Sequence, residues 1–379
     1  MNAEPRAAYV HVPFCRHRCG YCNFTLVAGR DDLIERYLAA LALELGTHRG
    51  PREVDTLFLG GGTPTHLPPA ALARLLEQVQ TTFPLAPGGE FSIEANPLDL
   101  ADPQRVAVLA AAGVNRVSLG VQSFSDRKLE LLERDHRRGE IAAAFAAARS
   151  FARSVSLDLI FGAPGETEAE WRGDLHAALD LAPDHLSTYG LTFERGTQFW
   201  NRLQREELQP VAEDSERRFY EAAIDTLTAA VFEHYEVSNF ARPGFRCRHN
   251  EAYWLGAQYF AAGPGAARHI AGVREMNHRS TTTWMARLAA GKSPVAEREE
   301  LSPEGRARER LVFGLRRLEG VERRSFAEET GYEIDALVGP ELQRYLGHGF
   351  LTEQSGHIAL TRAGLLISDA LWPAFLAEE

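Results

Sequence analysis

Three cysteines near the start of the chain have the residue type and spacing of a metal centre. Cys15, Cys19 and Cys22 follow directly after the apolar run 9–14, so three thiolates can meet at one place without any long-range folding. A closed structural zinc site takes four ligands, whereas three cysteines leave one coordination position open. Because an open position can bind a reactive ligand, the sequence predicts chemistry at this cluster of cysteines.

Two kinds of metal centre are compatible with this spacing. One is zinc in a structural or interaction protein, with Cys247 or a histidine as the fourth ligand. The other is a 4Fe–4S cluster in which each cysteine binds one iron and the fourth iron stays free. Zinc sites usually combine two cysteine pairs, and this chain has 4 cysteines with only one such pair. The spacing therefore favours the iron–sulfur cluster and leaves zinc as an alternative.

The bulk composition argues against several classes of protein. A net charge of −11 is unfavourable for a surface that neutralises phosphates, so we expect no nucleic-acid partner. Most of the 4 cysteines lie in one cluster, which is not the pattern of a secreted disulfide framework. The first residues do not read as a signal peptide, and no apolar run is long enough to span a bilayer. We therefore expect a cytoplasmic protein with no transmembrane segment.

Short apolar runs alternate with longer amphipathic stretches in the first half of the chain. The runs predict strands buried on both faces at 8–14, 56–60, 91–95, 116–121, 155–161 and 185–191. The stretches between them predict helices at 33–45, 69–82, 103–112, 126–134, 139–151 and 168–181. Such β/α units in series predict an α/β fold with right-handed crossovers, either a barrel or an open doubly wound sheet.

The alternation fades after about residue 213, which indicates further parts. We expect a core at 1–235, a connecting segment at 236–297 and a C-terminal domain at 298–379. The C-terminal pattern of helices, two short strands and a last helix suits a winged-helix-like α+β domain. Residues 240–265 of the connecting segment have a loop-like composition.

Glycine and polar residues collect where the predicted parallel strands end, at one mouth of the fold. They are Gly60, Gly61, Gly62, Thr63, Glu94, Gln122 and Asp158, with Arg134 on a following helix. Successive glycines let the backbone approach a polar ligand closely, and polar groups in apolar strands need partners. A ligand with hydroxyls, an amine and a carboxylate would supply those partners. Taken alone, Arg134 fits an ordinary surface residue better.

The connecting segment combines an imidazole with two flat aromatic side chains, namely His249, Tyr253 and Trp254. One interpretation is a structural turn that stacks against the core. The other is a porphyrin site in which His249 is the axial iron ligand and the aromatic rings contact the macrocycle. Cys247, two residues before His249, reads as a buried free thiol.

In combination these motifs resemble the radical S-adenosylmethionine superfamily. Residues 9–15, 94–97, 121–123 and 158–162 resemble the oxygen-independent coproporphyrinogen III oxidase family within it, and the resemblance covers nearly the whole chain. It implies a partial (β/α)6 TIM-like barrel and a 4Fe–4S cluster on the three cysteines, with S-adenosylmethionine on the open iron. The implied contacts are Gly60 to Thr63 at the methionine end, Glu94, Gln122, Arg134 and Asp158 at the ribose and carboxylate, and Tyr9 packed nearby.

Three features place the chain closer to the HemW-type heme chaperone branch of that family. Coproporphyrinogen dehydrogenases have a further cysteine where this chain has Phe24, and a longer arm than the fourteen residues before Cys15. The motif from His249 to Trp254 resembles the heme-binding motif of the chaperones. One departure is Ala267, where that branch usually has histidine.

The resemblance then implies heme capture at His249 and delivery to an acceptor hemoprotein, such as a membrane-bound respiratory protein. A flavodoxin or ferredoxin is the implied electron donor. The alternative is an oxygen-independent coproporphyrinogen III dehydrogenase, which carries out an oxidative decarboxylation in heme biosynthesis. Whether the chain turns over S-adenosylmethionine as an enzyme does not follow from its sequence.

Overall fold

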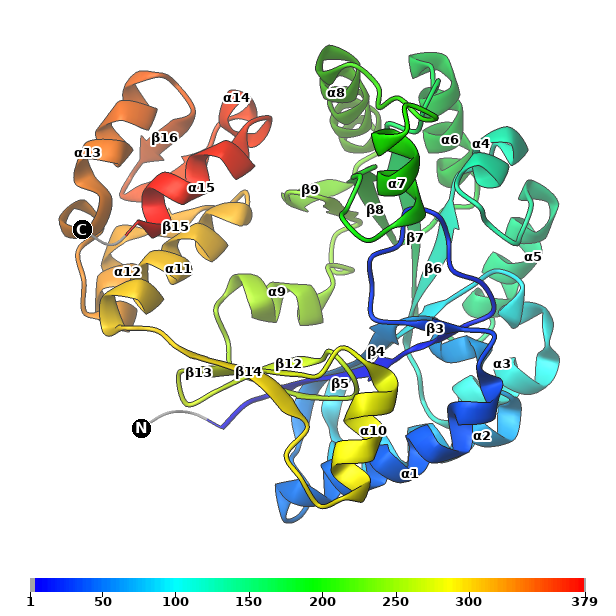
Figure 1. The fold of residues 1–379 in the computed structure, drawn as a ribbon. Coiled ribbons are helices and arrows are strands. Elements are labelled where there is room, and N and C mark those ends of the chain that lie inside the picture. The colour runs from blue at the N-terminus through cyan, green and yellow to red at the C-terminus, as the bar shows by residue number, and fades with distance from the viewer. Residues whose placement is uncertain (1–3, 378–379) are drawn as a thin grey trace.

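A computed structural model describes residues 4–377, and its centre is one large sheet (Figure 1). Its 12 strands lie in the order β14-β13-β12-β11-β1-β4-β5-β6-β7-β8-β10-β9. The six central strands are parallel and stand in chain order. They are β1 (Ala7–Val12), β4 (Val54–Gly61), β5 (Leu85–Ala95), β6 (Arg116–Gln122), β7 (Ser154–Phe161) and β8 (His185–Gly190). The predicted series of β/α units is therefore confirmed.

These strands form because each carries alternating apolar side chains that are buried in the core of the protein. Val10, Leu59, Ile93, Val117 and Leu157 are all fully buried in one continuous core. The helices that connect the strands cover the outer face (Figure 1). They are α1 (Ile34–Leu45), α2 (Pro69–Thr82), α3 (Pro103–Ala111), α4 (Asp126–Leu131), α5 (Arg138–Arg149), α6 (Glu168–Asp180) and, after the last parallel strand, α8 (Glu213–Ala229). The short helix α7 (Gln198–Gln204) packs on the cavity side instead, where the Phe199 N–H donates to Gly20 O at 2.9 Å.

The parallel strands form a partial barrel. Its two edge strands, β1 and β8, each pair with a strand from the second half of the chain. β8 pairs antiparallel with β10 (Asn239–Ala241), which in turn pairs with β9 (Glu233–Glu236). β1 pairs in parallel with β11 (Tyr259–Ala262). Beyond β11 the sheet continues through β12 (Ala267–Ile270), β13 (Val273–Asn277) and β14 (Val295–Glu300), and α10 (Thr281–Ala289) lies between the last two in sequence.

The prediction that residues 240–265 are loop-like is wrong, because the region contains β10, β11 and the helix α9 (Arg248–Trp254). The Glu90 carboxylate on β5 accepts hydrogen bonds from the backbone N–H groups of Arg248 (3.1 Å) and His249 (3.2 Å). These bonds satisfy donors that a helix N-terminus leaves free. The helix is thus stabilised by a residue far away in sequence, which a local pattern does not reveal.

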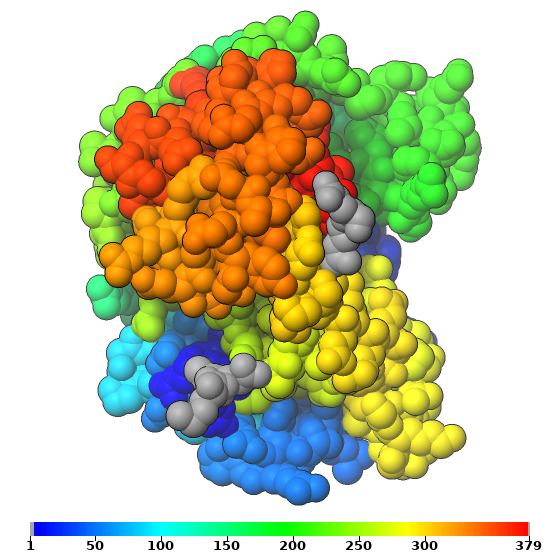
Figure 2. All heavy atoms as spheres, turned by 90° about the vertical axis from the view of Figure 1, so that its left-hand side faces the viewer, coloured from blue at the N-terminus to red at the C-terminus, as the bar shows by residue number. Residues whose placement is uncertain are grey.

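The C-terminal part has the predicted winged-helix-like layout. Its three-stranded sheet has the order β15-β17-β16, and its helices pack on that sheet. The elements are α11 (Pro303–Arg316), β15 (Val321–Glu322), α12 (Arg323–Thr330), α13 (Ile334–Gly347), β16 (Leu351–Gln354), β17 (His357–Leu360), α14 (Arg362–Leu365) and α15 (Ser368–Leu376). Figure 2 shows this part directly above the yellow segment that contains β14 and α10. Among residues 4–377, no helix is long and apolar enough to cross a membrane.

Candidate functional site

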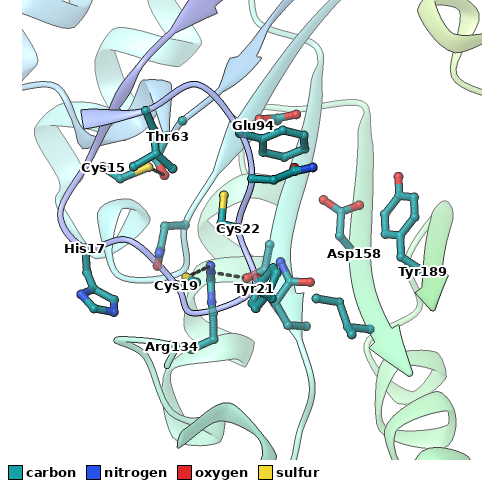
Figure 3. Close-up of a pocket in the computed structure, with 18 of the residues that line it drawn as sticks. Cys15, His17, Cys19, Tyr21, Cys22, Thr63, Glu94, Arg134, Asp158 and Tyr189 are labelled. Carbon is teal, nitrogen blue, oxygen red and sulfur yellow. Dashed lines mark hydrogen bonds between the residues drawn. The ribbon is translucent and has the colours of Figure 1, made fainter. Parts of the chain in front are cut away.

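A cavity of about 400 Å³ opens where the parallel strands end, and the three clustered cysteines lie on its wall (Figure 3). We call it the cluster cavity. Of the residues predicted from sequence, three lie on α9 and ten line this cavity: Cys15, Cys19, Cys22, Gly61, Gly62, Thr63, Glu94, Gln122, Arg134 and Asp158. Gly60 and Tyr9 do not line it: Tyr9 lies behind the wall, where its hydroxyl is 3.0 Å from His11 Nδ1.

The cysteines are held by a short excursion of the chain after β1. Cys15 belongs to β2 (Phe14–Cys15), which pairs with β3 (Val27–Ala28), and the loop between these strands carries Cys19 and Cys22. All three are free thiols. Burial raises the pKa of Cys15 to about 12 and also raises that of Cys22. Without a metal these two thiols are therefore neutral, and a bound iron would stabilise their thiolate forms.

The arrangement of the thiols bears on which metal they can hold. Within residues 4–377, no three histidine, cysteine or acidic side chains converge on a single-ion site. A cubane cluster needs no such convergence, because each cysteine binds a different iron. Cys247 does not line the cluster cavity: its Sγ is 3.6 Å from Oε1 of Glu90, four residues before Glu94 on β5, and burial raises its pKa to about 12. The arrangement is thus a poor fit to zinc with Cys247 as fourth ligand.

The glycines after β4 are required by the packing of the protein itself. A Cβ atom on Gly61 would lie 2.1 Å from the His11 ring, and one on Gly60 would lie 2.8 Å from the Glu94 carboxyl group. The Gly61 N–H donates to Glu94 Oε2 at 2.8 Å. Packing alone therefore accounts for Gly60, while Gly61 and Gly62 also line the cavity.

Two partly buried carboxyl groups give the cavity its polar floor: Glu94 on β5 and Asp158 on β7, the strands on either side of β6. Asp158 accepts from the Ser118 hydroxyl through both oxygens at 2.9 Å, and burial raises the Asp158 pKa. Burial raises the pKa of Glu94 to about 7, with a further contribution from the charge of Asp158. These groups are poised to accept hydrogen bonds from an amine or from hydroxyls of a bound ligand.

Arg134 lies in the cavity wall, so the reading of it as an ordinary surface residue is wrong. One guanidinium nitrogen donates to Gly120 O at 2.8 Å and another lies 3.5 Å from Cys19 Sγ (Figure 3). Its Nε is buried and has no partner among the described residues. Gln122 reaches the cavity through a backbone with φ of 66° at an irregularity in the β6–β7 pairing. An orphaned N–H beside the cysteines fits an anionic ligand such as a carboxylate.

Sequence reasoning missed several lining residues. Ser118 lies two positions before Gly120 on β6, and Ile160 lies two positions after Asp158 on β7. Strand alternation therefore places Ser118 on the same face as Gly120, and Ile160 on the same face as Asp158. Tyr189 faces the cavity from the end of β8 and is 43% exposed. For Ser118 and Ile160, the available signal was their spacing of two residues from strand-end residues. Tyr189 stands near the end of the strand predicted at 185–191, so the strand-end rule that placed the other lining residues applies to it as well.

The motif around His249 is built differently from a ligand site. His249 is 1% exposed, its Nδ1 is 2.9 Å from Thr56 Oγ1, and its Nε2 is 3.0 Å from the Tyr253 hydroxyl. The ring stacks on Phe58 with 5.2 Å between centroids, and burial lowers its pKa to about 3. His249 therefore lies outside the walls of both the cluster cavity and the second cavity described next.

A second cavity of about 600 Å³ lies between α9, the β12–β13 hairpin and helices α11 and α12. We call it the α9 cavity. Tyr253 and Trp254 line it, together with His269 on β12 and Phe313 on α11. The structure thus brings the three expected heme-contact residues onto one helix but orients them differently, with His249 toward β4 and the two aromatic rings toward this cavity.

Comparison with known proteins connects these features. The family model of the radical SAM superfamily matches residues 9–178, and the HemN C-terminal domain matches residues 301–367. Heme chaperone HemW of Bacillus subtilis is 34% identical over 98% of this chain and all of that protein. The chain belongs to the HemW family of radical SAM proteins.

Other relatives and one solved structure agree with this family. Heme chaperone HemW of Escherichia coli is 35% identical over the full length of both chains, and that of Mycobacterium tuberculosis is 38% identical over 98% of this chain and 95% of its own. Coproporphyrinogen III oxidase HemN of Escherichia coli, described as a radical SAM enzyme, superposes with a TM-score of 0.86 over 98% of this chain and 90% of its own. Its sequence identity is 22%, so that match establishes the fold alone.

Proposed function

We propose that this protein is a heme chaperone that binds a 4Fe–4S cluster, S-adenosylmethionine and heme, and delivers heme to acceptor hemoproteins. The observation that carries the proposal is the full-length similarity to proteins named heme chaperone HemW. It is supported by a cavity with three free cysteines and by a separate aromatic cavity at the α9 motif.

The residues of the cluster cavity fit the implied cofactors. Cys15, Cys19 and Cys22 would hold the cluster, and the unpartnered Nε of Arg134 would meet the carboxylate of S-adenosylmethionine. Gly61, Gly62 and Thr63 would face its methionine end, and Glu94, Gln122 and Asp158 would meet its amine and ribose hydroxyls. When bound, the cluster and S-adenosylmethionine together supply one-electron chemistry. The surrounding strands shield that site from water.

The three parts of the chain then have separate tasks in this proposal. Residues 1–235 hold the cluster and S-adenosylmethionine, residues 236–297 present the heme contacts through Tyr253 and Trp254, and residues 298–379 close the α9 cavity from the other side. An electron donor such as a flavodoxin or ferredoxin would reduce the cluster in the cytoplasm. The acceptor would be a hemoprotein, for example a membrane-bound respiratory protein.

Two measurements test this proposal. Anaerobically reconstituted protein should contain iron and labile sulfide in cluster stoichiometry and no zinc, and zinc without sulfide would instead support a structural protein. Protein loaded with hemin should then pass it to an excess of an apo-hemoprotein such as apomyoglobin, seen as a shift of the Soret band. Failure to bind hemin, or retention of hemin in the presence of the acceptor, would contradict the chaperone proposal.

A second candidate is an oxygen-independent coproporphyrinogen III dehydrogenase, which the shared fold with HemN favours. The residue two positions after Cys22 argues against this enzyme. Phe24 stands where those enzymes are expected to have a further cysteine, and its ring is 58% exposed at the cavity. Anaerobic incubation of the reconstituted protein with coproporphyrinogen III, S-adenosylmethionine and a reductant decides this point, because a decarboxylated product would establish the enzyme.

A further inference from the structure

The α9 cavity has two aromatic corners that suit a flat ring system. Tyr253 on α9 and Tyr259 on β11 meet edge to face, with 4.7 Å between ring centroids and an interplanar angle of 87°. Trp254 meets Phe313 of α11 at 6.2 Å in the same manner. The Trp254 Nε1 is buried and has no partner among the described residues. Such walls bury a planar apolar ligand and leave one polar donor for it.

His269 is the histidine that this cavity presents. It lies on β12 opposite Tyr259 in the antiparallel pairing, and their ring centroids are 6.2 Å apart. It is half-buried and lines the cavity. Imidazole is a common iron ligand in heme proteins.

Each charged side chain that lines this cavity has an ion-pair partner in the described part of the chain, except Arg306. Arg274 and Arg310 form ion pairs at 2.7–3.0 Å with the carboxylates of Glu299, Glu309 and Glu329. Arg306 lines the same cavity, and within residues 4–377 it has no carboxylate partner; its Nη1 donates to Leu301 O at 3.1 Å. The guanidinium of Arg306 is therefore the group that remains for a carboxylate of a bound ligand.

We propose that the α9 cavity binds a flat, carboxylate-bearing iron tetrapyrrole, with His269 as the axial iron ligand and Arg306 as a partner of a peripheral carboxylate. Tyr253 and Trp254 contact the macrocycle. His249 is a positioning residue, which holds the Tyr253 hydroxyl at 3.0 Å from behind the cavity wall. This inference rests on the proposed heme function. It assigns the axial iron ligand to a histidine outside the motif from His249 to Trp254.

His269 and His249 can be distinguished by titrating the full-length protein with hemin and with iron-free protoporphyrin. His269→Ala should bind hemin about tenfold more weakly, because an axial bond to iron is lost, and should bind protoporphyrin as the wild type does. Added imidazole should restore the wild-type Soret position. His269→Met keeps a ligand of another type and should shift the Soret band without abolishing binding.

The other variants separate contact from positioning. Arg306→Ala should weaken hemin and protoporphyrin to the same extent, by about tenfold, because its partner is a carboxylate rather than the iron. His249→Ala should also weaken both ligands equally, with a lower melting temperature and with the hemin spectrum of the wild type. The exposed His357 on β17 provides the matched control, and His357→Ala should change nothing.

The possible failures are distinguishable. If wild-type protein binds no hemin, both the proposed function and this inference are overturned. If wild-type protein binds hemin and His269→Ala, folded by circular dichroism, shows the same affinity and spectrum, only the inference is overturned. The inference, but not the proposed function, is also overturned if His249→Ala is the variant that loses the axial-ligand spectrum and added imidazole restores that spectrum.

Discussion

Replacing Glu94 with glutamine tests the electrostatics of the cluster cavity quantitatively. Burial raises the Glu94 pKa from its ordinary 4.5 to about 7, so the folded protein binds this proton more tightly than the unfolded chain does. Since each tenfold change in proton affinity is worth about 1.4 kcal/mol, the ionised carboxylate costs the metal-free protein about 3 kcal/mol of stability above pH 7. The cost is absent below pH 4.5 and grows as the pH rises from 4.5 to 7.

Glutamine is the appropriate replacement because its carbonyl oxygen still accepts the Gly61 N–H, which lies 2.8 Å from Glu94 Oε2. Glu94→Gln should therefore be more stable than the wild type by up to about 3 kcal/mol at pH 8, and nearly equal to it at pH 5. Urea unfolding of both metal-free proteins at the two pH values gives the difference. The exposed Glu77→Gln should stay within about 0.5 kcal/mol of the wild type.

An equal stability difference at both pH values would refute the reasoning, because it would mean that Glu94 keeps an ordinary pKa in the folded protein. The same variant also tests the ligand contact. If Glu94 accepts a hydrogen bond from the amine or ribose of S-adenosylmethionine, Glu94→Gln should bind that ligand more weakly although its metal-free form is more stable. Equilibrium dialysis of the reconstituted wild type and variant with S-adenosylmethionine measures this loss of affinity.

Three further predictions follow from buried groups elsewhere. Cys247→Ser should retain the full iron and labile sulfide content, since Cys247 lies away from the cluster cavity; loss of iron would make it a ligand. Lys128→Met should destabilise the protein by about 3–5 kcal/mol in urea unfolding, because the buried carboxylates of Glu166 and Asp174 lose their cationic partner. Gly61→Ala, at a φ of 106° and against a buried ring, should lower stability by about 2–5 kcal/mol, and a melting temperature equal to the wild type would contradict that packing.

The parallel core was predictable because short apolar runs alternate with amphipathic stretches along the chain. The run that became β7, for example, is buried at nearly every position, as parallel strands covered by helices are. The cluster cavity followed from the same pattern, since parallel strands place their ends at one edge. The position of Arg134 did not follow, because α4 ends at Leu131, before the expected end at residue 134, and contacts with Gly120 and Cys19 fix the side chain.

Helix α9 was missed for a reason that concerns function as well as prediction. Its N-terminus is held by Glu90, a residue 158 positions earlier than Arg248, so the helix exists only once the sheet has formed. A motif expected to be loop-like is therefore a short helix whose imidazole is buried. An axial iron ligand needs an accessible imidazole, whereas the ring contacts expected of Tyr253 and Trp254 need only a cavity wall.

Strand β4 links the two cavities and determines how His249 variants must be interpreted. Thr56 and Phe58 contact His249, and the next residue on the same face, Gly60, packs against Phe58 and Glu94. A cavity left by His249→Ala would be filled in part by movement of these residues. Loss of heme binding in that variant would then be accompanied by changes at Glu94, so the loss alone does not identify an iron ligand. An axial ligand is identified instead by a change in the hemin spectrum with unchanged binding of the iron-free porphyrin.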